Sequence, residues 1–402
     1  MARGKGDGGL YKDSRGLWTA VVELPPSFDG KRRRKVIRRK NKKKALDELN
    51  QLKATIAIYG DAVTGGRTVK DWVEYWLESI LANKAAPTTY RSYERSARVY
   101  IVPMLGKVKL SKVTARHVRD FHAQLAKIPV DKALREKPES QWGAGYKRLT
   151  ANTIKSAHSA LSKMLADAVT EGWILSNPAK IVGAPKVGEK ARTIEALSLP
   201  MVKRLLAYIA TRPDGALWAT YLLTGLRRGE VLGLELDRIN FDKRTLDASW
   251  QLQRISEDHI AKASEDYEVR HMHRTLYLTR PKSKSGWRVI PLVEPLYSIL
   301  KLHAQGRGPG LLFTREDGGP LNPDKVGDEW HDLLANAKIE SGATLHGARH
   351  TIVDLLYDAG VSEGVIQQIV GHSTIAMTRS YKTRGNPEQA KKALESLNEL
   401  LK

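Results

Sequence analysis

The sequence contains no cysteine among its 402 residues. Disulfides, cysteine-ligated zinc sites, iron–sulfur clusters and thiol nucleophiles are therefore excluded. It also lacks an apolar run close to the ~20 residues that a membrane-spanning helix needs, since the run from Ala216 to Leu223 is short and interrupted. The first residues, Met1 to Gly6, have no apolar segment of the kind that a signal peptide carries. These absences predict a soluble, intracellular protein.

Acidic residues are scarce relative to basic ones. There are 44 Asp and Glu against 67 Lys and Arg, which gives a formal net charge of +23 and a pI of about 9.9. A surface so basic repels itself unless a polyanion neutralises it, so nucleic acid is the leading partner. The alternative is a ribosomal or merely soluble basic protein. Hydrophobic residues make up 41% of the chain, enough for packed cores, and roughly 150 residues per domain suggests two or three domains.

The first sixty residues are the most basic part, with 16 Lys and Arg against 6 Asp and Glu. Short strands over 9–12 and 16–22, a third over 35–38 and a helix over 43–56 favour a small folded module over a disordered tail. Three strands can present basic and aromatic side chains to one groove of a duplex. The residues predicted to contact DNA are Tyr11, Lys12, Arg32, Arg33, Arg34, Lys35 and Arg38.

Residues 67–179 have the pattern of a small all-helical domain. Thr68 and Asp71 resemble a capping box at the start of a first helix. A second helix is predicted from Thr88 to about Val102, stopped by Pro103 and Gly106, and a third follows Thr114. A fourth spans 150–171. Residues 129–146 look like an insertion loop, and the Gly-, Pro-, Lys- and Ala-rich stretch 180–192 suits an exposed linker.

Residues 193–392 form the largest predicted unit, and helices dominate it. Two apolar stretches, 275–278 and 287–292, flank a polar turn and predict a β-hairpin. The charged region from Arg254 to Arg274 enlarges this hairpin region and has no evident purpose. The tail from 387 has an apolar stripe, which predicts an amphipathic helix that folds back or docks on a neighbour. The expected fold is thus multidomain and mainly α with small β parts.

Several polar residues with chemical potential are spaced along this unit. They are Arg227 at a predicted helix start, Lys282 in the polar turn, His346 and Arg349 in an HxxR motif, His372 after Gly371, and Tyr381 nine residues later. Singly none is specific, because a lone tyrosine is usually core or surface and a turn lysine is usually solvated. Together they suit phosphodiester transfer without a metal. Arginine forks neutralise phosphate oxygens, histidine takes a proton, lysine donates one, and tyrosine holds the phosphoryl group.

The order Arg…Lys…His-x-x-Arg…Gly-His…Tyr resembles the catalytic signature of the tyrosine recombinases, the lambda-integrase family. Residues 87–90, 101–106 and 168–178 look like that family's helical core-binding domain, and the basic N-terminal module is similar to arm-binding domains of phage and integrative-element integrases. The resemblance covers nearly the whole chain. It implies an arm-type DNA-binding domain (1–60), a core-binding domain (67–179), a linker (180–192), a mixed α+β catalytic domain (193–392) and a C-terminal helix tail (393–402).

The resemblance also implies a role for each site residue. Arg227 and Arg349 would clamp the scissile phosphate, and His372 would hydrogen-bond it. Tyr381 would attack phosphorus, forming a 3′-phosphotyrosine and releasing a 5′-hydroxyl. No metal, ATP or other cofactor is expected.

Two further residues would move protons. His346 would accept or orient the tyrosine proton, and Lys282 would protonate the 5′-oxygen. Lys284 competes for that second role, but Lys282 directly follows Pro281 and aligns with the family pattern. Glu230 is expected to brace Arg227 by a salt bridge. Ser283 stands where threonine is more usual, and Gly347-Ala348 replaces the commoner Asp-Leu.

The partners implied are double-stranded DNA with core-type and arm-type sites, three further copies of the chain in a homotetramer, an excisionase or directionality factor, and a DNA-bending host protein, with no membrane. The expected location is the cytoplasm of a bacterial host, at the nucleoid. Two alternatives remain. The same chemistry could serve another task, such as resolution of chromosome dimers or plasmids or a topoisomerase-like relaxation of DNA. The chain could otherwise be a non-cleaving DNA-binding regulator of the same fold.

Overall fold

The computed structural model describes residues 9–24, 32–59, 67–82, 84–143, 145–185, 195–281, 287–372 and 374. The chain divides into two compact units, Met1–Ala191 and Arg192–Lys402. The finer domain boundaries remain predictions. Over the ranges just given, no helix is both long and apolar enough to cross a bilayer.

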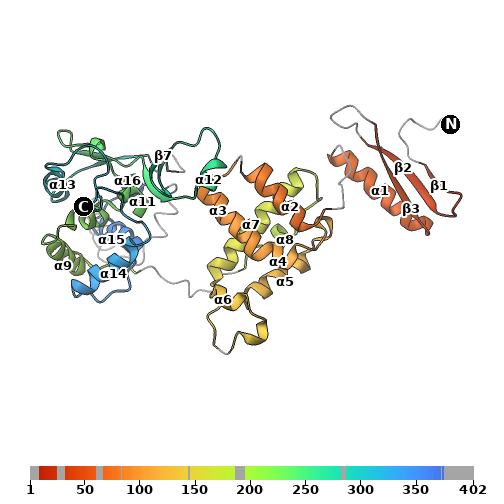
Figure 1. Ribbon diagram of the computed structural model, residues 1–402, viewed down its shortest axis with the longest axis horizontal. Helices are drawn as coiled ribbons and strands as arrows, with labels where there is room; N and C mark the ends of the chain where they lie inside the picture. Colours follow the sequence, from red (N-terminus) through yellow and green to blue (C-terminus); the bar gives the residue numbers. More distant parts are fainter. Residues whose placement is uncertain are drawn as a thin grey trace, which may run out of the picture. The chain divides into compact units, whose positions relative to one another are not determined.

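The N-terminal module is a three-stranded antiparallel sheet with one helix packed on one face (Figure 1). Its elements are β1 (Leu10–Lys12), β2 (Trp18–Leu24), β3 (Arg33–Arg39) and α1 (Lys42–Tyr59). Ala20 lies opposite Ile37 in the β2–β3 register. These two residues pack with Val22, Leu49 and Leu52 in a small core between sheet and helix. The predicted sheet-plus-helix module is confirmed.

The next segment is all-helical, as predicted. Its elements are α2 (Val69–Tyr75), η1 (Trp76–Leu81), α3 (Pro87–Ser96), η2 (Ala97–Ile101), α4 (Val102–Leu105), η3 (Leu110–Lys112), α5 (Ala115–Leu125), α6 (Lys132–Arg135), η4 (Glu139–Gln141), α7 (Ala151–Thr170) and α8 (Pro178–Val182). Thr68 and Asp71 form the predicted capping box. Trp72 and Trp76 are fully buried, and the indole N–H of Trp72 donates to the carbonyl of Met164 at 3.1 Å. The first helix is thereby tied to α7.

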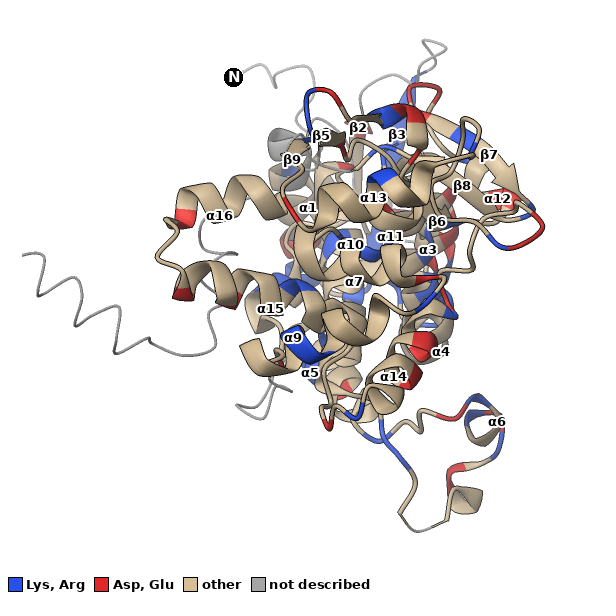
Figure 2. Ribbon diagram, turned by 90° about the vertical axis from the view of Figure 1, so that its left-hand side faces the viewer, with Lys and Arg blue, Asp and Glu red and all other residues tan. Residues whose placement is uncertain are grey.

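Two features of this segment differ from expectation. Pro103 does not stop its helix, which continues to Leu105 and ends at Gly106, the second predicted stop. The wider π-type turn of η2 ends at Ile101, two residues before this proline. Pro103 then lies in the first turn of α4, where its missing N–H is tolerated. The predicted insertion loop contains the short elements α6 and η4, and its base is closed by a bridge between Pro129 and Arg148. It projects from the bundle with basic and acidic residues mixed along it (Figure 2).

The second unit combines helices with two small sheets. Its elements are α9 (Leu199–Ile209), α10 (Gly215–Thr224), α11 (Arg228–Leu232), η5 (Leu236–Arg238), β4 (Ile239–Asn240), β5 (Thr245–Asp247), β6 (Gln251–Arg254), α12 (Glu257–Ala261), β7 (Val269–His273), β8 (Leu276–Thr279), β9 (Val289–Pro291), α13 (Leu296–Ala304), α14 (Val326–Asn336), α15 (Leu345–Asp358) and α16 (Glu363–Val370). Helix α10 is apolar on all sides and almost wholly buried, packing against α9, α13 and α15. The mixed α+β expectation is confirmed.

The predicted hairpin is wrong. Strand β8 is central in the sheet β6-β8-β7, whereas β9 pairs with β5 in the sheet β4-β5-β9. Because both edges of β8 are already occupied, it has no edge left for β9. The region from Arg254 to Arg274 supplies α12 and β7, and β7 fills one of those edges. The predicted C-terminal helix lies outside the described residues.

Candidate active site

Arg227 is held at the junction between α10 and α11. The chain turns at Gly225, whose left-handed φ of +62° favours glycine, and a Cβ there would meet a methyl carbon of Ile352 at 2.6 Å. Arg227 then caps α11. Its Nη1 donates to Oε1 of Glu230 at 2.7 Å, and its Nη2 donates to the carbonyl of Gly371 at 3.0 Å. The predicted salt bridge to Glu230 is therefore present.

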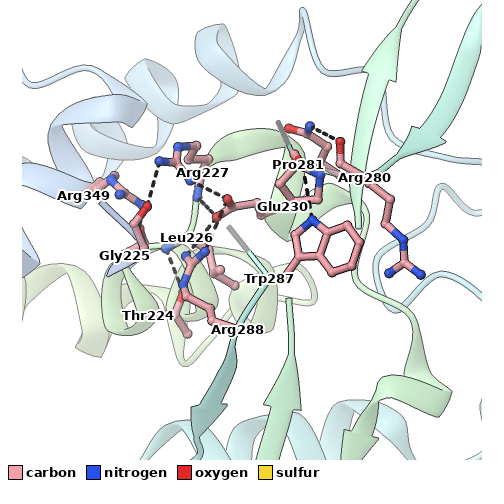
Figure 3. Close-up of polar contacts among 12 residues, drawn as sticks. Thr224, Gly225, Leu226, Arg227, Glu230, Arg280, Pro281, Trp287, Arg288 and Arg349 are labelled. Atoms are coloured by element: carbon pink, nitrogen blue, oxygen red, sulfur yellow. Dashed lines mark hydrogen bonds and ion pairs between the residues drawn. The ribbon is translucent and has the colours of Figure 1, made fainter. Parts of the chain in front are cut away.

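Glu230 lies between two arginines and is only 1% exposed (Figure 3). Besides Arg227, it binds Arg288, whose Nη2 donates to Oε2 at 3.0 Å. Burial alone would raise the pKa of the Glu230 carboxyl, but Arg288 and Arg227 hold it below its usual value. Arg288 also donates from Nε to the carbonyl of Ile369, two residues before Gly371. The carboxylate thus joins α11 to the segment before β9 and, through the arginines, to the end of α16.

Arg288 is a site residue that the sequence interpretation missed. Its side chain is 7% exposed. The available signal was a charge in the apolar stretch from Trp287 to Leu292, because a charge that turns inward from such a stretch requires a partner.

His346 and Arg349 both come from the first turns of α15, one helical turn apart. Arg349 is 2% exposed, and its Nη1 donates to the carbonyl of Gly225 at 2.6 Å. Burial, with the nearby charges of Arg349 and Arg227, lowers the pKa of His346. The imidazole is therefore neutral at neutral pH and able to accept a proton.

One cavity of about 440 Å³ adjoins this pair of side chains. The remaining residues that line it are Leu226, Arg228, Gly327, Asp328, His331, Thr344 and Leu345. The HxxR pair thus borders a space between α11, α14 and α15.

His372 follows the left-handed Gly371 that ends α16. Its backbone is fixed on both sides by Gln367, whose carbonyl accepts from the His372 N–H and whose side-chain amide donates to the His372 carbonyl. The side chain is 1% exposed. Burial and the charges of Arg349 and Arg227 lower the pKa of His372 to about 3. A neutral histidine here can donate a hydrogen bond without adding charge.

The structure brings four of the six predicted catalytic residues together. Arg227 reaches the residue before His372, Arg349 reaches the residue two before Arg227, and both arginines depress the pKa of His346. Two arginines beside neutral histidines, with one carboxylate between Arg227 and Arg288, make a site suited to a phosphate group. Lys282 and Tyr381, with the competing Lys284, lie outside the described residues.

The predicted DNA-contacting residues of the N-terminal sheet divide between its two faces. Side chains alternate along a strand, and α1 covers the face that carries Ala20 and Ile37. The register places Tyr11 and Arg38 both opposite Thr19, and Arg34 opposite Glu23, so these three share the face without the helix. The predicted residues with the opposite orientation are Lys12, Arg33 and Lys35.

The helix-free face carries exposed side chains. Tyr11 is 52% exposed, and Arg34 and Arg38 are exposed as well. Arg32 precedes β3 and forms an ion pair with Glu23. This face combines an aromatic ring with guanidinium groups, which suits a duplex better than the helix-covered face does.

Two sequence profiles match the chain. The profile described as the phage integrase family covers residues 197–386, and that of the phage integrase N-terminal SAM-like domain covers residues 68–126. The chain belongs to the phage integrase family. The larger match includes the positions of all six residues predicted to act in catalysis. As a family member the chain is a site-specific tyrosine recombinase of the kind that integrates mobile elements.

Two relatives resemble this recombinase over nearly their whole length. An integrase of Saccharopolyspora erythraea is 25% identical over 92% of this chain and 92% of its own, and a XerC-like tyrosine recombinase of Caldanaerobacter subterraneus is 26% identical over 97% of each. Among solved structures, the Tn1549 transposon integrase in complex with a circular intermediate DNA matches with a TM-score of 0.62 and 20% identity, over 83% of this chain and all of that one. This last likeness shows the fold.

Proposed function

We propose that the recombinase cuts and rejoins DNA through a 3′-phosphotyrosyl bond to Tyr381. One observation carries the proposal. Arg227, His346, Arg349 and His372, which the sequence spreads over 146 positions, meet at the ends of α10, α15 and α16. A packed core has no need of two arginines and two histidines of lowered pKa in one place. Phosphoryl transfer does need such a group of side chains.

The arginines supply the phosphate clamp. Guanidinium groups of Arg227 and Arg349 donate hydrogen bonds to the non-bridging oxygens of the scissile phosphate and stabilise the charge that grows there. His372, neutral at working pH, adds a further donor. Glu230 and Arg288 keep Arg227 in place from behind.

The remaining residues move the proton and the phosphoryl group. The phenol oxygen of Tyr381 attacks phosphorus while its proton passes to His346. The bond from phosphorus to the 5′-oxygen breaks, and Lys282 gives that oxygen a proton. The products are a 3′-phosphotyrosine and a free 5′-hydroxyl, and rejoining is the reverse with another 5′-hydroxyl. The energy of the phosphodiester stays in the protein–DNA bond, so ATP has no part.

The N-terminal sheet gives this recombinase a second DNA contact. Its helix-free face, with Tyr11, Arg34 and Arg38, would hold an arm-type site while the helical and catalytic domains hold the core site. Support comes from the likeness to lambda integrase, solved as a tetramer bound to a Holliday junction, which matches with a TM-score of 0.53 and 15% identity over 96% of this chain. We infer a tetramer on double-stranded DNA, with a directionality factor and a DNA-bending host protein as accessory partners, at the bacterial nucleoid.

Resolution of chromosome dimers or plasmids is a second candidate task, favoured by the likeness to the XerC-like recombinase. Removing residues 1–60 separates the two. Loss of recombination between attachment sites, with cleavage of the core site retained, supports the integrase task. Unchanged recombination of a short symmetric site supports resolution.

The proposed chemistry is tested with a nicked attachment-site duplex, which spans the junction between the mobile element that encodes the recombinase and the flanking DNA. After cleavage the short 5′-hydroxyl strand diffuses away and religation stops. Wild-type protein should accumulate a covalent DNA adduct that survives denaturation, and Tyr381→Phe should not. Absence of an adduct with wild-type protein, despite binding of the duplex, would identify a non-cleaving regulator.

A further inference from the structure

Arg280 lies at the end of β8, two residues before Lys282, and is held by two indole rings. Its guanidinium carbon lies over Trp250 at 4.2 Å and over Trp287 at 4.8 Å from the ring centroids. Its Nε donates to the carboxylate of Glu268 at 3.1 Å. Stacking of a planar guanidinium on aromatic faces is a contact that lysine reproduces poorly. We call Arg280, Trp250 and Trp287 the indole clamp.

Hydrogen bonds fix the backbone at the same place. The side-chain amide of Gln251 donates to the carbonyl of Arg280 at 3.2 Å, and Nε1 of Trp287 donates to the carbonyl of Pro281 at 3.3 Å. The second of these contacts is drawn in Figure 3, where Trp287 lies against Pro281. Both peptide carbonyls that precede Lys282 therefore have a side-chain donor. Arg280 and Pro281 are thus fixed directly before Lys282 in the sequence.

The other arginines on Trp250 show what is special about Arg280. Arg270 lies over the same ring at 4.3 Å and Arg238 at 5.7 Å. Both are bound to Glu235, and neither belongs to the chain segment that leads into Lys282, since Arg270 lies in the neighbouring strand β7, opposite Leu278, and Arg238 in η5. Of the three arginines that lie over Trp250, Arg280 is the one that also lies over Trp287. The Trp287 side chain is 47% exposed, although burial of its ring would be favourable. Its place is explained by the contacts to Arg280 and Pro281 rather than by a core.

We propose that Arg280 is a positioning residue for proton donation to the leaving 5′-oxygen. The inference rests on the proposed role of Lys282. Lysine has a long, flexible side chain, so its ammonium group reaches one oxygen atom efficiently only if its backbone is held. The indole clamp and the hydrogen bonds from Gln251 and Trp287 hold the two residues that directly precede Lys282. Arg280 itself does not touch the DNA phosphate in this proposal.

A leaving group that needs no proton tests the proposal. In a duplex with sulfur in place of the bridging 5′-oxygen, the thiolate departs unprotonated. Arg280→Ala should slow cleavage of ordinary DNA by about 10- to 100-fold, within the range known for misplaced or missing general acids. On the sulfur duplex its rate should return to within about threefold of wild type, as should that of Lys282→Ala.

Arg270→Ala is the matched control, since it removes an equal stack on Trp250 without touching the Lys282 segment. Its cleavage rate on ordinary DNA, relative to wild type, should be the same as on the sulfur duplex. Arg280→Lys, which keeps the charge and loses the planar stack, replaces the alanine variant if the latter unfolds, as judged by thermal unfolding beside Arg270→Ala.

The possible outcomes distinguish the positioning role of Arg280 from the proton-donating role of Lys282. If Lys282→Ala is repaired by sulfur and the Arg280 variants are slow on both duplexes, the positioning role is wrong and the role of Lys282 stands. If Lys282→Ala is not repaired, the proposed role of Lys282 is wrong, and the positioning inference falls with it. Wild-type cleavage of ordinary DNA by the Arg280 variants would overturn the inference directly.

Discussion

Replacing Glu230 by Gln is the perturbation that the structure defines most sharply. The change keeps the shape of the side chain and removes the one charge that separates Arg227 from Arg288. The amide oxygen still accepts one hydrogen bond, but the amide NH2 now faces a guanidinium group. Two arginines are left with like charges around a neutral group that is 1% exposed.

The cost follows from burial. Breaking a buried ion pair by removing one partner typically costs ~3–5 kcal/mol because the other charge stays buried. Arg288 is 7% exposed and cannot escape to water, whereas Arg227 is 36% exposed and can. We therefore expect a loss near the lower limit, about 3 kcal/mol, which lowers the melting temperature of a unit of this size by roughly 6–12 °C.

The pH dependence has a definite sign. The two arginines lower the pKa of folded Glu230, so its contribution to stability is fully present above the ordinary glutamate pKa of about 4.3. It is lost as pH falls through the lower folded value. The wild-type advantage over Glu230→Gln should be constant from pH 8 to pH 5 and shrink below pH 4.

Thermal unfolding followed by circular dichroism measures the stability, and single-turnover cleavage of the nicked duplex measures the effect on Arg227. Cleavage should fall by about 100-fold, because displacing a phosphate-binding group by ~1 Å has that effect. Glu235→Gln is the control, since Glu235 is also buried between two arginines but outside the site. It should destabilise less, because its partners Arg238 and Arg270 are 24% and 42% exposed and can reach water, and it should cleave nearly normally. Equal stability of Glu230→Gln and wild type, or equal loss of cleavage in both variants, would refute the reasoning.

Three further predictions concern single side chains. Arg349→Lys should lower cleavage by at least about 100-fold with DNA affinity nearly kept, because lysine lacks the two-pronged donor geometry; single-turnover rates beside binding isotherms check this. Since burial and two arginines lower the pKa of His346, the acid-side midpoint of the cleavage rate should lie below pH 6.5. A pH–rate profile with that midpoint above 6.5 contradicts this expectation. Arg34→Ala should weaken arm-site binding and reduce the slope of log affinity against log salt concentration by about 1, while Arg33→Ala leaves both nearly unchanged. A salt titration in which the two variants behave alike would show that the helix-free face is not the DNA-binding face.

Local sequence patterns predicted the local parts of the structure. The Thr68–Asp71 capping box spans four residues and formed as expected. The strands of the N-terminal module and the helix carrying His346 and Arg349 are likewise set by short-range periodicity. The bridge from Arg227 to Glu230 joins residues three apart and was also predictable.

Contacts between distant segments were not predictable in the same way. Arg288 lies 58 residues from Glu230, and no local pattern specifies that pairing. The assignment of 275–278 and 287–292 to one hairpin failed because β7, drawn from the uninterpreted region 254–274, occupies the edge of β8 that a hairpin partner would need. Charge alone also did not reveal which of the alternating basic residues of β3 face away from the helix, because that depends on where α1 packs.

The measurement closest to the central claim is the chemical identity of the protein–DNA bond. A nicked attachment-site duplex, trapped with wild-type protein and digested by protease and nuclease, yields a peptide joined to a nucleotide that mass spectrometry can sequence. We expect a peptide that contains Tyr381, linked through its phenol oxygen to a 3′-phosphate, with a free 5′-hydroxyl on the other strand end. A link to another residue, or to a 5′-phosphate, would contradict it.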